Sequence, residues 1–397
     1  MFSIKNIGLR NVEVADTKLC LIDGENGRLL YRGYDIFDLA KNSTFEETSY
    51  LLLYGDLPTK EQLDEFDEHL RRTRALPKEV IDAMIHRSKN ARPMDVLISS
   101  VAMLADYDPM DESKPANLER SINLIAKLPT IVATWNAIRS NKPIPEPDPD
   151  LSHAANTLYM LLDSMPDKEI ARMFDVCLIL HAEHSFNAST FAARQVASTR
   201  AHMYACICAA IAALSGDLHG GANVAVMKNL LEIGDESRVE DWVKARLDAG
   251  DKIMGLGHAV YKTDDPRAKI LREMSRRLAA RTGSKWYSIT SRMEQIAKEE
   301  VRRRRGVEIY ANVDLYSASV YYSMGIPIDL YTCIFAIARI SGWCAHVIEE
   351  KFAEAQPKPV LYRPAATYVG RYCGPLGCEY VPVPKRNNND VTKQDEA

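Results

Sequence analysis

The sequence predicts a mainly α-helical protein with one short pair of β-strands near its N-terminus. Three observations carry this prediction. Apolar residues recur at helical spacing in most segments, continuous β-branched alternation is scarce, and turn residues separate the two strand-like stretches. The chain has 397 residues, 46% hydrophobic and 26% charged, which is ordinary globular composition and enough for one large or two ordinary domains.

The strand pair is expected over residues 18–22 and 28–31. Between these stretches, residues 23–27 read Asp-Gly-Glu-Asn-Gly. Glycine and asparagine adopt the backbone conformations that tight hairpin turns need. The sequence therefore predicts one small β-hairpin ahead of the helices.

Helical periodicity dominates the segments that follow. Amphipathic or buried helices are expected over residues 46–53, 59–74, 78–86, 93–104, 122–139 and 154–162. Prolines at alternate positions of the segment 141–149 exclude a helix there, so this segment is predicted to be a surface connection. The polar tail, residues 384–397, is predicted to be disordered.

Four consecutive arginines, 302–305, would suit either a nucleic-acid patch or the end of a helix. They follow apolar residues at helical spacing, and cations stabilise a helix C-terminus. The net charge of −4 also argues against a general nucleic-acid binder. A solvated helix end is therefore predicted, with no nucleic-acid partner.

Membrane, targeting and cysteine signals are weak. The longest apolar run, 203–214, is too short to cross a bilayer, and the N-terminus lacks signal or transit features. A soluble, intracellular and cytoplasmic protein is expected. None of the eight cysteines forms a C-x-x-C pair, so no zinc or redox pair is predicted. Cys373 and Cys378 bracket a Gly-Pro turn and could form a local bridge.

Two histidines and one aspartate are the leading catalytic candidates. His219, His258 and Asp314 each lie in or beside a short stretch rich in glycine or asparagine. Two imidazoles and a carboxylate on special backbone are what acid–base chemistry on a carbon acid requires. Taken singly, His219 would only line a turn and Asp314 would only cap a helix.

Arg267 is a candidate ligand for an anion. Asp265 suits the N-cap of a helix and Pro266 its first residue, so Arg267 stands in the first turn beside free backbone N–H groups. Helix N-termini attract anions, and a cation there favours an anionic ligand. The alternative is a surface arginine paired with a nearby carboxylate such as Asp264.

Arg339 lies in a predicted helix, residues 328–351, that is apolar on most faces. With Trp343, His346 and Glu350 it forms one polar stripe on this helix. A nearly buried arginine needs either an internal salt bridge, to Glu350 or another acid, or a ligand. The ligand would be a carboxylate, which a guanidinium binds through two N–H groups.

His181 and His184 follow an apolar run and are two candidate metal ligands. The spacing lacks the H-E-x-x-H pattern, and no cysteine or obvious third ligand lies nearby. No metal site is therefore predicted. One histidine in the core and one facing a polar site is the favoured interpretation.

The order of these motifs resembles the citrate synthase family over nearly the whole chain. The matching segments are 179–194, 218–223, 255–267, 312–324, 338–346 and 363–370. The resemblance implies a mainly helical, two-domain fold. Residues 1–215 and 313–383 would form a large helical domain, and residues 216–312 a smaller one that closes over the active site.

The resemblance also implies a reaction. The methyl carbon of acetyl-CoA joins the ketone of oxaloacetate and the thioester is then hydrolysed, so the chain would be an acyltransferase of the tricarboxylic acid cycle. Asp314 would take the methyl proton, His219 would hydrogen-bond the thioester oxygen, and His258 would polarise the ketone. The oxaloacetate carboxylates would be held by His184, Arg267, Arg339 and Arg363.

Cosubstrate and subunit contacts follow from the same resemblance. CoA would lie along Lys252, Ile253, Met254, Gly255 and Leu256, with Lys262 near its phosphates. Members of the family are dimers in which the residue matching Arg363 reaches into the partner's site, so a homodimer is expected. Oxaloacetate and an acyl-CoA are the implied substrates, without a metal, prosthetic group or membrane.

Three positions depart from the family pattern. Asp217 stands where proline is usual, and an acid two residues from His219 could raise the pKa of that imidazole, which would work against a neutral donor. Leu256 and Ala365 replace other usual residues and bear on CoA affinity.

Acyl-CoA choice stays open within the family. The 2-methylcitrate synthases, which use propionyl-CoA, share several motifs, and one methylene is worth only about 1–3 kcal/mol in an apolar pocket. Two remoter alternatives are a catalytically inactive structural or binding relative and a metal-dependent lyase at His181 and His184.

Overall fold

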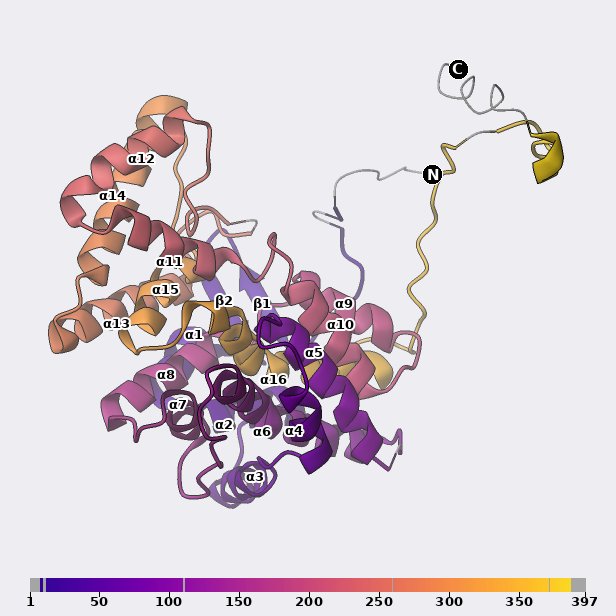
Figure 1. Ribbon diagram of the computed structural model, residues 1–397, viewed down its shortest axis with the longest axis horizontal. Coiled ribbons are helices and arrows are strands. Elements are labelled where there is room, and N and C mark those ends of the chain that lie inside the picture. The colour runs from indigo at the N-terminus through magenta and orange to yellow at the C-terminus, as the bar shows by residue number, and fades with distance from the viewer. Residues whose placement is uncertain (1–7, 10–11, 110, 259, 371, 387–397) are drawn as a thin grey trace. The chain divides into compact units, whose positions relative to one another are not determined.

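The computed structural model describes residues 8–9, 12–109, 111–258, 260–370 and 372–386, and it confirms the mainly helical prediction (Figure 1). Its α-helices are α1 (Ile36–Asn42), α2 (Phe45–Tyr54), α3 (Lys60–Arg72), α4 (Lys78–Ile85), α5 (Pro93–Leu104), α6 (Lys114–Arg139), α7 (His153–Leu162), α8 (Lys168–His181), α9 (Ala188–Ala197), α10 (Met203–Leu214), α11 (Ala222–Ile233), α12 (Val239–Asp248), α13 (Pro266–Thr282), α14 (Trp286–Arg305), α15 (Val313–Ser323) and α16 (Tyr331–Lys351). The chain divides into two units, Met1–Leu361 and Tyr362–Ala397.

The predicted hairpin is present, with one strand more than expected. Strands β1 (Cys20–Asp23) and β2 (Arg28–Tyr31) pair antiparallel, and β3 (Tyr34–Asp35) pairs antiparallel with β2. The third strand has only two residues and follows a turn in which Arg32 and Gly33 have positive φ. A strand this short leaves no periodicity for a sequence pattern to detect.

The six predicted early helices correspond to α2 to α7. Only α6 differs clearly, because it begins at Lys114 and not at residue 122. Ser113 caps this helix by accepting from the backbone N–H of Ala116, and Pro115 occupies its first turn. These start signals precede the apolar part of the helix, which is why periodicity alone missed them.

Two further sequence predictions are confirmed. Residues 141–149 contain no helix. The run of arginines ends α14, and Gly306 follows in the left-handed conformation with φ +66°. Arg303 and Arg304 pair with Glu300, so these cations are part of a solvated helix end.

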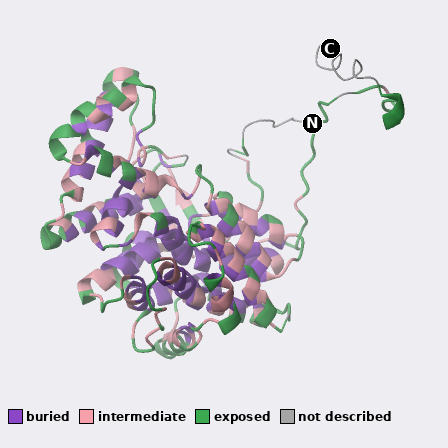
Figure 2. Ribbon diagram, viewed as in Figure 1, coloured by how far each residue is buried: buried purple, intermediate pink, exposed green. Residues whose placement is uncertain are grey.

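Helix α16 lies in the core of the first unit. Almost all its residues are buried, and it contacts α2, α6, α8, α9 and α10 (Figures 1 and 2). By length and composition the segment Ile328–Lys351, a 3-10 turn followed by α16, could cross a membrane, but 94% of its apolar window is buried inside the protein. That burial identifies it as a core helix.

The second unit carries the predicted local bridge. Cys373 and Cys378 form a disulfide with their Cα atoms 4.8 Å apart. Val383–Lys385 forms a 3-10 turn, so the predicted disordered tail begins inside a described element, while residues 387–397 lie outside the described residues. Large apolar side chains are exposed along this unit: Tyr368, Val369, Tyr372, Leu376 and Tyr380.

Candidate active site

His219 lies in the loop between α10 and α11. Its Nε2 atom is 3.2 Å from the backbone N of Ser189 and 2.8 Å from the Ser189 Oγ. Because a backbone N–H can only donate, Nε2 accepts and the neutral ring carries its proton on Nδ1. Burial, reinforced by the charge of Arg339, lowers the pKa of His219 to about 4. The imidazole is therefore neutral at physiological pH.

The possibility that Asp217 raises the pKa of His219 is wrong. Asp217 is exposed, and its charge acts on Arg92. Water screens an exposed carboxylate, whereas burial of the imidazole directly disfavours its charged form. The departure from the family pattern at position 217 therefore leaves the neutral donor intact.

His258 is held in the opposite tautomer. Its Nδ1 atom accepts from the backbone N–H groups of Val260, at 2.9 Å, and Tyr261, at 3.2 Å. The neutral ring therefore carries its proton on Nε2. Burial and then Arg267 lower the pKa of His258 to about 4, although Asp265 opposes the shift. The two catalytic candidates thus offer different ring N–H groups.

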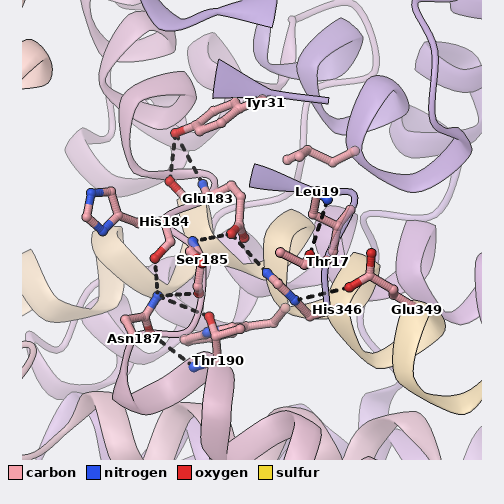
Figure 3. Close-up of polar contacts among 12 residues, drawn as sticks. Thr17, Leu19, Tyr31, Glu183, His184, Ser185, Asn187, Thr190, His346 and Glu349 are labelled. Carbon is pink, nitrogen blue, oxygen red and sulfur yellow. Dashed lines mark hydrogen bonds and ion pairs between the residues drawn. The ribbon is translucent and has the colours of Figure 1, made fainter. Parts of the chain in front are cut away.

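His184 comes from the turn between α8 and α9 (Figure 3). The ring centroids of His184 and His258 are 5.5 Å apart, and Nε2 of His184 is 3.2 Å from the hydroxyl oxygen of Tyr261. Burial, followed by the charge of Arg267, holds the pKa of His184 well below its ordinary value. His184 is a third neutral imidazole in the same region.

Asp314 is the second residue of α15 and does not cap that helix. Asn312 is the cap, and its Oδ1 atom accepts from the backbone N–H of Asp314 over 3.0 Å. Burial raises the pKa of the Asp314 carboxyl to about 6, while Arg267 and Arg339 limit the increase. Asp314 is therefore a stronger base than an ordinary aspartate and is still ionised at neutral pH.

Hydrogen bonds hold the segment of His258 against the start of α15. The backbone N–H of Asn312 donates to the Gly255 carbonyl, and Nδ2 of Asn312 donates to the Gly257 carbonyl, each over 3.0 Å. Gly255 has φ +87°, and a Cβ there would lie 2.9 Å from the Cα of Leu315. Glycine therefore permits the close approach that brings the imidazole and the carboxylate into one site.

Arg267 is buried at the start of α13. Its Nε and Nη2 atoms donate to the two carboxylate oxygens of Asp265, over 3.0 and 2.7 Å. The alternative of a surface arginine paired with Asp264 is wrong, because Asp264 binds Lys298 and the backbone N–H of Ala311. Nη1 of Arg267 hydrogen-bonds to none of the residues that the structure describes.

Arg339 is buried in α16, and its alternative partner Glu350 binds Arg194 at 2.7 Å instead. Its Nε atom donates to the His181 carbonyl over 2.6 Å, and its guanidinium lies 4.7 Å from the ring centroid of Phe335. Burial lowers the pKa of Arg339 to about 10, so it stays cationic at neutral pH. Within the described part of the chain neither Nη atom has a hydrogen-bond partner, which leaves both for an anionic ligand.

The segment predicted to bind CoA leads into the same site. Its residues range from exposed to buried: Lys252 exposed, Met254 and Leu256 half-buried, Ile253 and Gly255 buried. Leu256 forms a β-bridge with Ala311, just ahead of α15. Lys262 is exposed and forms an ion pair with Glu25 in the hairpin turn. The role of each in CoA binding stays a prediction.

Three side chains that could ligate a metal lie together in this site, but their hydrogen bonds favour an anionic ligand over a metal ion. One ligand atom from each of His184, His258 and Asp265 lies within 4.8 Å of the others. Arg267 occupies both oxygens of Asp265, and the tautomer of His258 leaves a proton on the nitrogen that would have to ligate. His181 belongs to the core, where its Nδ1 bonds the Cys177 carbonyl over 2.8 Å.

Two residues that shape this site were not predicted from the sequence. Ser189 donates its backbone N–H to His219, and the neighbouring Asn187 caps α9 by accepting from the Thr190 N–H. Tyr261 lies between His184 and His258, and its position three residues after His258 was the one available signal.

Arg363 lies in the second unit and is exposed. Its predicted place at a substrate site, across a subunit interface, stays a prediction.

The chain is similar to known proteins over most of its length. The family description "Citrate synthase, C-terminal domain" matches residues 8–365. A citrate synthase of Haloferax volcanii is 42% identical over 96% of this chain and 98% of its own length, and a 2-methylcitrate synthase of Shewanella oneidensis is 37% identical over 91% and 94%.

Two solved structures are also similar. The citrate synthase of Pyrobaculum aerophilum has a TM-score of 0.87, with 40% identity over 96% of this chain and 95% of that one. A citrate synthase of Thermoplasma acidophilum, in a ternary complex with carboxymethyl coenzyme A and oxaloacetate, has a TM-score of 0.87, with 34% identity over 96% of this chain and 98% of that one. The chain therefore belongs to the citrate synthase family, enzymes that transfer an acyl group to form citrate.

Proposed function

We propose that His219, His258 and Asp314 of this chain catalyse the condensation of acetyl-CoA with oxaloacetate to citrate and CoA. One observation carries the assignment: two neutral imidazoles with opposite tautomers accompany a carboxylate of raised pKa in one buried, cationic region. Carbon acids need a base of sufficient strength and neutral N–H donors for the developing oxygen charge.

Asp314 takes a proton from the methyl group of the thioester. With a pKa of about 6, against an ordinary value of 3.8, its carboxylate holds that proton about a hundredfold more tightly than an exposed aspartate would. The electron pair of the C–H bond moves toward the thioester carbonyl, and an enol or enolate forms. The methyl group of a thioester is a far weaker acid than the Asp314 carboxyl group. Proximity of the carboxylate to the methyl group must therefore supply the rest of the activation.

His219 stabilises the enol through its Nδ1–H. The backbone N–H of Ser189 occupies the other ring nitrogen and so keeps the proton on Nδ1. Because the pKa of its imidazolium form is about 4, the ring is neutral at physiological pH, and its remaining N–H, a very weak acid, can hydrogen-bond the thioester oxygen.

His258 binds the ketone oxygen of oxaloacetate through Nε2–H. The enol carbon attacks the ketone carbon, and a carbon–carbon bond forms. The alkoxide that develops on the ketone oxygen takes the Nε2 proton of His258, and the proton that Asp314 removed from the methyl group returns through solvent to the imidazole, so that both residues regain their starting states. The product at this stage is citryl-CoA. Water then cleaves its thioester and releases citrate and the CoA thiol.

Oxaloacetate carries two carboxylates, and the site supplies cations for them. The Nη atoms of Arg339, which have no hydrogen-bond partner among the described residues, suit a bidentate carboxylate. Arg267 adds a second guanidinium, and His184 adds a neutral hydrogen bond. We assign Arg363 of a second copy as the third arginine, and hence a homodimer. The exposed apolar side chains of the second unit, such as Tyr368 and Val369, support a partner surface there.

CoA is assigned to the backbone from Lys252 to Leu256, with Lys262 near its phosphates. Closure of a small domain, residues 216–312, onto a large one, residues 1–215 and 313–383, would exclude water until condensation is complete. The cytoplasm, with no nucleic-acid or membrane partner, is the location we infer for this reaction.

The second candidate is 2-methylcitrate formation from propionyl-CoA, which the 2-methylcitrate synthases among the relatives favour. The test measures oxaloacetate-dependent thiol release and compares kcat/KM for acetyl-CoA and propionyl-CoA. A higher value with acetyl-CoA is expected, since relatives called citrate synthase reach the higher identities. A higher kcat/KM with propionyl-CoA would reverse the assignment, and no thiol release with either thioester would refute the proposed enzymatic activity.

A further inference from the structure

Glu183 is a buried carboxylate that no step of the reaction uses. It lies in the turn between α8 and α9 (Figure 3), and its side chain is fully buried. Burial alone would raise the pKa of this carboxyl, yet His346 and Arg339 hold it below its ordinary value. Glu183 is therefore an anion inside the protein, and such a charge is costly unless its surroundings compensate it.

One carboxylate oxygen holds the turn that carries His184. Oε1 accepts from the backbone N–H of Ser185 over 2.5 Å and from Nε2 of His346 over 2.9 Å. Ser185 has φ +50°, a left-handed conformation that a serine rarely adopts. The hydrogen bond from Ser185 to Glu183 offsets this strain and fixes the direction in which the neighbouring His184 leaves the turn (Figure 3).

The other oxygen faces α16. Oε2 has no hydrogen-bond partner among the described residues, and a Cβ at Gly342 would lie 2.3 Å from it. Arg339 and His346 lie one turn before and one turn after Gly342, on the same face of the helix. Glu183 also provides the largest charge effect that opposes the lowered pKa of Arg339. The carboxylate thus lies between a substrate-binding cation and His346.

Arg194 holds His346 through the ring nitrogen that Glu183 does not contact. Nη1 of Arg194 is 2.9 Å from Nδ1 of His346, and because a guanidinium only donates, the imidazole keeps its proton on Nε2 for Glu183. Arg194 also pairs with Glu349 and Glu350, each over 2.7 Å. Such buried networks hold their members in one arrangement when every charge is compensated.

We propose that Glu183 is a positioning residue for oxaloacetate, which acts through His184 and Arg339 and does not touch the substrate. The proposal rests on the proposed function, since that function assigns the substrate carboxylates to these two side chains. The acceptor oxygen fixes the His184 turn. The negative charge compensates Arg339 while the site is empty, and a substrate carboxylate takes over this compensation on binding.

The test compares Glu183→Ala with Glu183→Gln. Alanine removes acceptor and charge, and it should raise KM for oxaloacetate at least about tenfold while kcat at saturation and KM for acetyl-CoA change less than about threefold. Glutamine keeps the acceptor and should restore KM for oxaloacetate to within about threefold of wild type. Because glutamine lacks the charge that competes with the substrate carboxylate for Arg339, its KM should lie at or below the wild-type value, and the tighter binding should let oxaloacetate raise the Tm of this variant more than that of the wild type.

Glu46 provides the matched control. It is also a buried glutamate, 5% exposed, and it accepts a backbone N–H, that of His153, over 2.7 Å in another part of the fold. Glu46→Ala and Glu46→Gln should therefore change Tm but leave KM for oxaloacetate within about twofold of wild type.

Different results would refute the positioning role of Glu183, its charge compensation of Arg339, or the proposed function itself. An unchanged KM in Glu183→Ala, or an equal rise in both Glu183 variants, refutes positioning through the turn. An equal oxaloacetate-induced rise in Tm in the wild type and Glu183→Gln refutes charge compensation, and this measurement decides the case if Glu183→Ala does not fold. Failure of the wild type to release thiol with oxaloacetate would refute the proposed function instead.

Discussion

Replacing Asp314 by asparagine should remove activity and stabilise the enzyme at neutral and higher pH. The amide has nearly the same shape, and the helix cap survives because it uses the backbone N–H of Asp314 and the side chain of Asn312. Loss of the base should lower kcat by at least about 10²–10⁴-fold. Oxaloacetate binding should persist, since its assigned ligands are other side chains.

The gain in stability follows from the raised pKa. The carboxyl titrates near 6 in the folded protein against an ordinary 3.8, a difference of about two units, and each unit corresponds to about 1.36 kcal/mol. A raised pKa means that the folded state disfavours the ionised form. The resulting loss of folding stability is absent below pH 3.8, grows as pH rises, and is complete above pH 6. It amounts to no more than about 3 kcal/mol, because the carboxyl is half-buried and partly screened by water.

Chemical denaturation of the ligand-free enzyme at pH 5 and pH 8 measures this gain. Asp314→Asn should be stabilised by up to about 3 kcal/mol at pH 8 and by roughly half as much at pH 5. Asp241→Asn is the control, because Asp241 is an exposed acid in the first turn of α12. A gain that does not increase with pH, or near-normal turnover in Asp314→Asn, would refute the reasoning.

Three further outcomes are expected. The kcat/KM of the wild type should rise with pH through about 6 as Asp314 ionises, with no loss above it from the two imidazoles of pKa about 4; a pH-independent profile between 5 and 7 would contradict this. Arg339→Leu should raise KM for oxaloacetate about ten- to hundredfold in steady-state assays, and an unchanged KM would return Arg339 to a packing role. Gly255→Ala should lower both Tm and kcat, because its Cβ meets Leu315, whereas Gly283→Ala, at φ +69° with open space around it, should lower Tm alone; equal kcat in the two variants would contradict the contact.

Much of the fold was predictable because its signals are local. Apolar periodicity and caps gave five of the six early helices nearly to their ends, and the turn residues at 23–27 gave the hairpin. The start of α6, the helix α1 of 7 residues and the strand β3 of 2 residues were missed, since none of them carries a long periodic pattern of its own. The cysteines 373 and 378 form their local bridge because the turn between them is short.

The sequence by itself determined the helical class, because apolar periodicity and helix caps are local signals. It also indicated His219, His258 and Asp314 as catalytic candidates, because each lies in or beside a short stretch rich in glycine or asparagine. Only the tertiary structure decided the state of those groups. The tautomer of His219 depends on the N–H of Ser189, thirty residues away, and the raised pKa of Asp314 depends on burial beneath distant segments. Likewise, Glu350 and Arg339 share a helix face in sequence, yet packing gives Glu350 to Arg194 and leaves Arg339 for a ligand. Protonation and pairing are set by solvent exclusion and by neighbours in space, and neither is encoded at the position itself.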